Sequence, residues 1–74
     1  MEDARIVYFY AEIEPDYGNE CCGIHRSASK PEDVTNPTWI HIPVYDLDYF
    51  GKFYINGAWY EDAAGTIPWQ SSLI

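Results

Sequence analysis

Four residues of this chain carry side chains that commonly bind transition metals: Cys21, Cys22, His25 and His41. The two cysteines are adjacent, so the chain lacks the spaced cysteine pair of a zinc motif. On a regular strand Cys21 and His25 share one face and Cys22 points away, which leaves Cys21, His25 and His41 as an alternative zinc site. The simpler interpretation is a packed thiol and two surface imidazoles, so we expect no metal and no cofactor.

The adjacent cysteines also limit disulfide chemistry. A bond between them would close a small strained ring and could not join distant segments. We therefore expect two reduced thiols on one strand, with one side chain facing into the protein and the other facing out. A chain without a stapling disulfide is typical of an intracellular protein.

No arrangement of side chains indicates an enzyme. A nucleophilic serine would need a G-x-S-x-G turn, which surrounds none of Ser27, Ser29, Ser71 and Ser72. Asp46 and Asp48 could in principle do acid–base chemistry. Within the corner DLDYFG, however, we expect Asp46 to cap the turn and Asp48 to face water.

The composition is acidic and aromatic. The formal net charge is −8, from twelve acidic and four basic residues, and the chain has seven Tyr, three Trp and three Phe. Phosphate contacts need Lys and Arg, so this charge argues against direct nucleic-acid binding and equally against anionic membrane surfaces. It fits a basic protein partner, and the aromatic content indicates an ordered chain.

No segment predicts passage into or across a membrane. The longest apolar runs fall far short of the ~20 residues of a membrane span. The start, MEDARIVYFYAEIE, is acidic and lacks the basic beginning of a signal peptide. We expect the chain to stay in the compartment where it is made.

Three segments have the β-branched and aromatic composition of strands, at residues 5–13, 21–27 and 38–45. Neither face of the first strand is strongly polar, so we expect it to be central or covered on both sides. In the second strand, Gly23 predicts a weak point or a bulge. In the third, Pro43 lacks an N–H and predicts an open edge.

The stretch FYINGAWYE predicts a hairpin. Asn-Gly at 56–57 is a strong signal for a type I′ turn, which needs positive φ at both central residues. A two-residue turn fixes the pairs as Ile55–Ala58, Tyr54–Trp59, Phe53–Tyr60 and Lys52–Glu61. Residues 28–37 predict a polar loop with one helical turn at Pro31–Val34.

Together these elements predict an all-β fold: a small antiparallel meander of about five strands, ending in the type I′ hairpin and an extended C-terminal tail. Residues 1–62 form the single β domain and residues 63–74 the tail. The tail has no regular period but contains apolar side chains that a solvated terminus would avoid. It is therefore either an anchor for a partner or a lid over the protein's own sheet.

Three stretches, VYFYAEI, NECCGI and IHIPVYDLDYFGKFYINGAWYED, resemble small structural proteins of tailed bacteriophages and short modules of phage tail-fibre and baseplate proteins. The shared features are a Y-A-x-I first strand, a C-x-G-I second strand and a Y-D-x-x-Y-x-G-K-x-Y-x-x-G-x-W segment. The resemblance covers residues 7–62. It implies an assembly part of a virion and offers no catalytic residues.

This resemblance implies a non-enzymatic component of the tail, baseplate, neck or capsid surface, made in the bacterial cytoplasm and located in the virion. Its partners would be other virion proteins in a homo- or hetero-oligomeric assembly. The alternative is a phage-encoded acidic inhibitor that mimics nucleic acid and blocks a host nucleic-acid-binding protein. We expect partner contacts through Trp39, Tyr45, Tyr54, Trp59, Ile67, Trp69, Leu73 and Ile74.

Overall fold

The structure is a computed structural model that describes residues 6–74. It contains five strands: β1 (Tyr8–Glu14), β2 (Glu20–Ser27), β3 (Trp39–Ile42), β4 (Phe53–Ile55) and β5 (Ala58–Tyr60). Three single-turn 3-10 helices connect them: η1 (Pro15–Tyr17), η2 (Pro31–Asp33) and η3 (Leu47–Tyr49). The predicted beginning of the first strand, at Arg5, lies outside the described residues.

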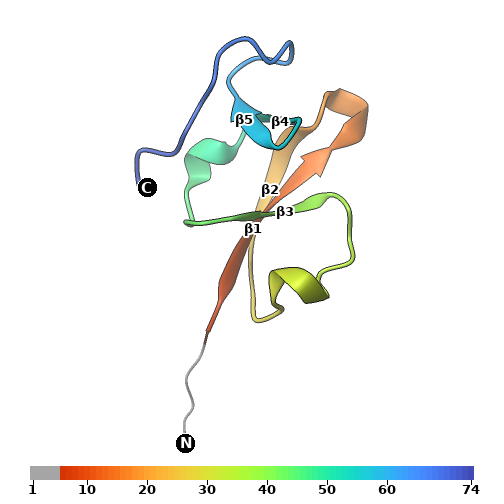
Figure 1. The fold of residues 1–74 in the computed structure, drawn as a ribbon, viewed down its shortest axis with the longest axis vertical. Helices are drawn as coiled ribbons and strands as arrows, with labels where there is room; N and C mark the ends of the chain where they lie inside the picture. The colour runs from red at the N-terminus through yellow and green to blue at the C-terminus, as the bar shows by residue number, and fades with distance from the viewer. Residues whose placement is uncertain (1–5) are drawn as a thin grey trace, which may run out of the picture.

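The strands form one antiparallel sheet, so the predicted all-β fold is confirmed. Its strand order, β3-β1-β2-β4-β5, differs from the sequential order of a meander. After β2, the loop at 28–38 carries the chain across to the far side of β1, where β3 pairs (Figure 1). β1 is therefore central, as its two apolar faces predict, and β4 pairs with β2 instead of β3.

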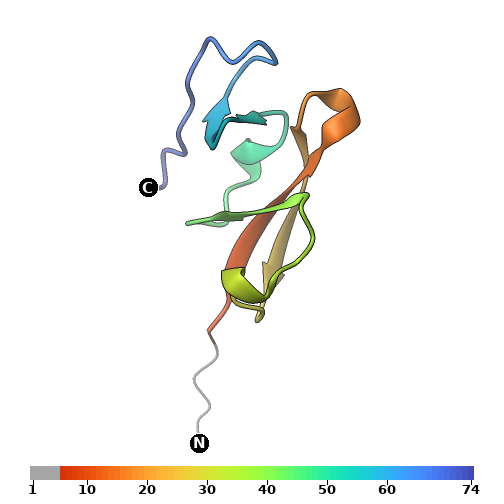
Figure 2. The same cartoon turned by 45° about the vertical axis from the view of Figure 1, so that its right-hand side comes forward.

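Strand β3 is shorter than predicted. It ends at Ile42, directly before Pro43, whose missing N–H cannot continue a ladder. In Figures 1 and 2 it crosses in front of β1 at a steep angle, as expected for a strongly twisted small sheet.

A bulge separates the two cysteines. Glu12 pairs with Gly23 and Ile13 pairs with Cys21, so Cys22 is the extra residue on β2. The predicted bulge at this glycine is therefore present. Because the bulge inserts one residue, the side chains of β2 do not alternate regularly across it. Cys21 lies on the core face with Ala11, so the expectation that Cys21 and His25 share a face is wrong.

The apolar core lies on one face of the sheet. Its buried centre is Ala11, Cys21, Ile42 and Tyr49, and partly buried side chains pack around it, namely Phe9, Ile24, Val44, Trp59 and Trp69. Tyr49 comes from η3, Trp59 from the hairpin and Trp69 from the C-terminal segment. The core is thus closed by parts of the chain that follow the three longest strands in sequence.

The hairpin has the predicted register in three pairs, Phe53–Tyr60, Tyr54–Trp59 and Ile55–Ala58. Its two turn residues, Asn56 and Gly57, have positive φ values of 50° and 85°. The turn type itself stays a prediction. The expected Lys52–Glu61 pair lies outside the ladder: the Lys52 ammonium donates to the Asp48 carbonyl at 3.0 Å, and the Glu61 N–H donates to the Ile67 carbonyl at 2.8 Å.

The C-terminal segment covers the outer edge of β5. Tyr60 and Pro68 form an isolated bridge, and the Trp69 N–H donates to the Trp59 carbonyl at 2.9 Å. The segment turns back at Gly65, which has φ of 71°. Asp62 caps this turn by accepting hydrogen bonds from the Thr66 and Ile67 N–H groups, each at 2.9 Å from Oδ1.

Candidate protein-contact surfaces

Opposite the apolar core, the sheet carries a cluster of aromatic and imidazole side chains. His25 stacks on Trp39 with ring centroids 4.3 Å apart and planes 9° apart. Tyr10 contacts both Trp39 and His41, at centroid distances of 5.7 and 5.6 Å. The four rings come from β2, β3 and β1, which the strand order places side by side. We call Tyr10, His25, Trp39 and His41 the aromatic cluster.

A carboxylate fixes the His25 ring in this cluster. Glu12 Oε1 lies 2.8 Å from His25 Nε2, and each side chain is about one-third exposed. Gly23 makes room for the contact, because a Cβ at this position would lie 3.2 Å from His25 Nε2 and 3.3 Å from Glu12 Oε1. A side chain at this position would therefore be tightly packed, and the imidazole or the carboxylate would have to shift by a few tenths of an ångström to admit it.

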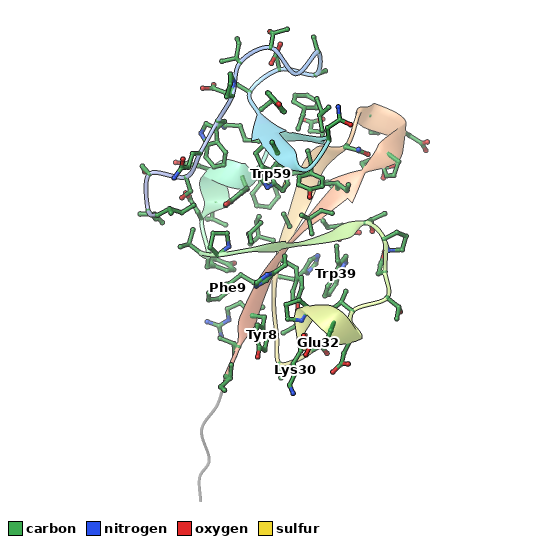
Figure 3. All side chains as sticks on the ribbon, in the orientation of Figure 1. Tyr8, Phe9, Lys30, Glu32, Trp39 and Trp59 are labelled. Atoms are coloured by element: carbon green, nitrogen blue, oxygen red, sulfur yellow. The ribbon has the colours of Figure 1, made fainter. Side chains whose placement is uncertain are left out.

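Tyr10 is the buried member of the cluster, with only 1% of its surface exposed. Its hydroxyl donates to the Ser29 carbonyl at 2.5 Å, which ties the loop that follows β2 over this face. Burial raises the pKa of the Tyr10 phenol, and the charges of Tyr8, Glu32 and Asp33 act in the same direction. Glu32 and Asp33 belong to η2, so the carboxylates of this turn lie close to the aromatic cluster. Figure 3 shows Glu32 near Tyr8 and Trp39.

A second polar contact joins the η3 corner to the C-terminal segment. The Ser71 hydroxyl donates to Asp46 Oδ2 at 2.5 Å, and both residues are buried, with 3% and 7% of their surfaces exposed. Asp46 Oδ1 also accepts the Asp48 N–H at 2.9 Å, so Asp46 caps η3 as predicted, and Asp48 is exposed. The hydrogen bond from Ser71 is the main cause that lowers the pKa of the Asp46 carboxyl, followed by the Asp48 N–H.

Exposed apolar side chains flank both residues of this contact along the chain. Within three residues of Asp46 or Ser71 along the chain, four large side chains are between 45% and 61% exposed: Tyr45, Leu47, Leu73 and Ile74. Figures 1 and 2 both place the C-terminus beside the end of β3 and η3. We call these four residues the C-terminal patch.

The residues predicted to contact a partner fall into three groups. Tyr45, Ile67, Leu73 and Ile74 are exposed. Trp59 and Trp69 pack against the core, each with its ring edge-on to the Tyr49 ring. The ring centroid of Tyr54 lies 5.0 Å from that of Trp59. Trp39 is half-buried in the aromatic cluster, on the other face of the sheet.

The thiols are poorly suited to chemistry. Both cysteines are free; Cys21 is buried and Cys22 is exposed, which confirms the predicted inward and outward arrangement. Burial raises the pKa of the Cys21 thiol to about 11. Desolvation and the nearby carboxylates of Glu12 and Glu14 also raise the pKa of Cys22. Thiolate is the reactive form, so neither residue is an activated nucleophile.

Residues 6–74 contain no group of three or more His, Cys, Asp or Glu side chains placed to hold a metal ion. Over the same residues, no helix is long and apolar enough to cross a membrane. The surface of the described residues carries exposed apolar side chains, aromatic rings and carboxylates.

Sequence reasoning missed the two polar contacts that organise these surfaces, Glu12–His25 and Asp46–Ser71. The first depends on the bulge-shifted pairing of β1 with β2, and the second joins residues 25 positions apart. Comparison with protein-family models, with curated proteins and with solved structures gives no match to this chain. The fold and surfaces define it as a small all-β protein with one open sheet.

Proposed function

We propose that this protein is a non-enzymatic structural component of a tailed-phage virion and acts through protein–protein contacts. The observation that carries the contact role is the C-terminal patch, where Tyr45, Leu47, Leu73 and Ile74 are exposed around the buried Asp46–Ser71 bond. The Asp46–Ser71 bond joins the two segments that carry these side chains, and large apolar side chains exposed close together are typical of a surface that another protein covers. The virion location rests on the resemblance of residues 7–62 to phage tail-fibre and baseplate modules.

The size of the protein supports the same proposal. Of the 69 described residues, few large side chains are fully buried; Tyr10 and Ile42 are the largest below 2% exposure. A chain of this size buries only about 60% of its unfolded surface, so its own core gives limited stability. Contact with a neighbouring subunit would bury the apolar side chains that this chain leaves exposed.

A mass-spectrometric inventory of purified particles, released by cells that carry the gene, tests this proposal. We expect the protein to be present at a fixed ratio to a tail or capsid protein after gradient purification and a high-salt wash, since apolar contacts resist salt. Its presence only in the free protein fraction of the lysate would contradict the proposal.

The alternative function, an acidic inhibitor that mimics nucleic acid, is favoured by one specific feature. Glu12, Glu14 and Glu20 all lie close enough to Cys22 to raise the pKa of its thiol, so carboxylates gather at the end of the sheet formed by β1 and β2. Such a mimic would compete with DNA for its target, and raising the salt from 50 to 300 mM would weaken the competition steeply. Salt-sensitive competition with DNA would support the inhibitor and count against the virion component.

A further inference from the structure

We propose that the free edge of β3 binds an extended, arginine-containing segment of a partner protein, which adds to the sheet as a sixth strand. This inference rests on the proposed protein-contact function and identifies the kind of partner and the place of contact. It is distinct from the C-terminal patch, which lies at the end of β3 and η3 and offers only apolar side chains.

The two edges of the sheet differ in what covers them. The β5 edge is occupied by the chain's own C-terminal segment, through the Tyr60–Pro68 bridge and the hydrogen bond from the Trp69 N–H to the Trp59 carbonyl. At the other end of the strand order, no segment within residues 6–74 pairs with the outer side of β3. An unpaired strand edge is a template for another strand.

The register shows which backbone groups of β3 face outward. The Ile13 N–H donates to the Thr38 carbonyl at 2.8 Å, which makes this a hydrogen-bonded pair. Hydrogen-bonded and non-hydrogen-bonded pairs alternate along an antiparallel ladder, so Ala11–Ile40 is bonded and Tyr10–His41 is not. The N–H and C=O of His41 therefore point away from β1.

Two neighbours of His41 limit the length of the edge. The Trp39 N–H donates to the Asn36 carbonyl at 3.2 Å, so only the Trp39 carbonyl remains available on the outer side. Pro43 has no N–H to offer. A partner strand can therefore form a reciprocal pair of hydrogen bonds with His41 and a third with Trp39, which suits a short segment.

The side chains beside the edge determine the charge of the partner. His41 is exposed and Trp39 half-buried, and η2 places Glu32 and Asp33 near the same face. Glu12, which contacts His25, adds a carboxylate to this face, and Figure 3 shows Lys30 and Glu32 at the same end of the molecule as Tyr8 and Trp39. A guanidinium group both pairs with carboxylates and stacks on aromatic rings, so arginine fits this surface best.

Main-chain hydrogen bonds supply affinity in such strand addition, while alternate side chains supply specificity. A second copy of this chain is a poor occupant, because the formal net charge of each copy is −8. The same charge attracts a basic segment, and this complementarity is the reason that we choose a basic partner over self-association.

The test uses the full-length protein and a blocked seven-residue peptide in which valine and arginine alternate. We expect saturable binding in calorimetry, with amide NMR shifts concentrated at residues 39–42 and small at residues 58–60. A matched peptide with glutamate in place of arginine should bind at least tenfold more weakly. Equal binding of both peptides, or shifts confined to other residues, would overturn the proposal.

Two variants isolate the backbone contact. His41→Ala removes the ring and keeps the outward N–H, whereas His41→Pro removes both and leaves the bonded pairs Ala11–Ile40 and Phe9–Ile42 in place. We expect His41→Pro to bind the arginine peptide at least fivefold more weakly than His41→Ala. Equal affinities in two folded variants would show that the edge is not used.

A charge variant keeps the test valid if His41→Pro does not fold. Glu32→Gln combined with Asp33→Asn should weaken peptide binding about threefold or more, whereas Glu61→Gln, at the far end of the strand order, should not.

Dimerisation of the free protein through residues 39–42 would also contradict the proposal, since the occupant would then be a second copy. Wild-type protein found in particles but unable to bind the peptide would refute this inference alone, whereas peptide binding without incorporation would refute only the virion role.

Discussion

The Ser71 hydroxyl lies 2.5 Å from Asp46 Oδ2, and this buried hydrogen bond holds the end of the chain against the corner that follows β3. Because Leu73 N–H also donates to Ser71 Oγ at 3.1 Å, the serine connects the last residues to the η3 corner. The exposed side chains of the C-terminal patch depend on this connection for their arrangement.

Ser71→Ala removes the hydroxyl that satisfies the buried carboxylate. We expect the free energy of unfolding to fall by about 1 kcal/mol or more, the usual contribution of an intramolecular hydrogen bond. Chemical denaturation monitored by tryptophan fluorescence measures the loss. Ser72→Ala is the matched control, because Ser72 is exposed, and equal effects of the two changes would contradict the structural role of Ser71.

The contribution of this hydrogen bond should depend on pH. The pKa of the Asp46 carboxyl is lowered below its ordinary value of 3.8 in the folded protein, chiefly by Ser71. A lowered folded-state pKa stabilises the fold above the unfolded pKa, and this stabilisation is lost as the pH falls through the folded value. The stability difference between wild type and Ser71→Ala should therefore be constant from pH 5 to 7 and shrink below pH 3.8. A difference that grows on acidification would contradict this assignment.

Gly57→Val tests the hairpin turn. Gly57 has φ of 85°, and no atom lies within 4 Å of the position that a Cβ would take, so only backbone strain opposes the substitution. We expect a loss of roughly 1–2 kcal/mol, the cost of placing an L-residue in the left-handed region. Gly57→Asn is the control and should cost less, because asparagine tolerates positive φ. An unchanged melting temperature in Gly57→Val would show that the turn differs from the one described.

Gly23→Ala tests the arrangement of the aromatic cluster. The added Cβ would lie 3.2 Å from His25 Nε2 and 3.3 Å from Glu12 Oε1, so the contact between these two side chains must adjust by a few tenths of an ångström, and we expect the imidazole to shift. Stacking on the Trp39 indole should shift the His25 ring protons upfield in NMR spectra of the wild type, and these resonances should move downfield in Gly23→Ala. Cys22→Ala, at the exposed bulge residue, should leave these resonances unchanged. Unaltered His25 resonances in Gly23→Ala would mean that the stack does not depend on the glycine.

Local sequence patterns were sufficient to predict the strands and the hairpin pairs. Val, Ile and aromatic residues identify β1, and Asn-Gly fixes the three hairpin pairs, because both signals act over only a few residues. The single turn at Pro31 and the cap at Asp46 were also predictable, since proline and aspartate side chains restrict the adjacent backbone.

The strand order was not predictable in the same way. A meander joins neighbouring strands, whereas the loop at 28–38 is long enough to cross β1, and no local signal selects between these paths. The bulge at Cys22 reversed the expected face of Cys21, since one inserted residue shifts the alternation. The Asp46–Ser71 bond depends on the final path of the C-terminal segment, which has no periodic pattern.

The C-terminal segment has two roles that single substitutions can separate. Trp69 packs against the core, with its ring 4.8 Å from Tyr49 and the Lys52 ammonium 4.9 Å from its centroid. We expect Trp69→Ala to lower the free energy of unfolding by roughly 2–4 kcal/mol, near the range for loss of a buried aromatic side chain. Deleting residues 66–74 should therefore lower the melting temperature sharply and expose apolar surface to a dye, as expected for a lid.

Leu73 and Ile74 should behave differently, because each is 61% exposed. Replacing both with serine removes apolar surface that the fold itself does not bury, so the free energy of unfolding should change by no more than about 0.5 kcal/mol. If the C-terminal patch is covered in the particle, burial of a side chain of this size contributes roughly 1.5–3 kcal/mol there. Incorporation of the double variant into purified particles should then fall at least tenfold relative to a Thr35→Ser control, measured by quantitative mass spectrometry. A stable double variant that is incorporated as well as wild type would show that these two residues are not the anchor, and a variant that unfolds would show that they belong to the lid.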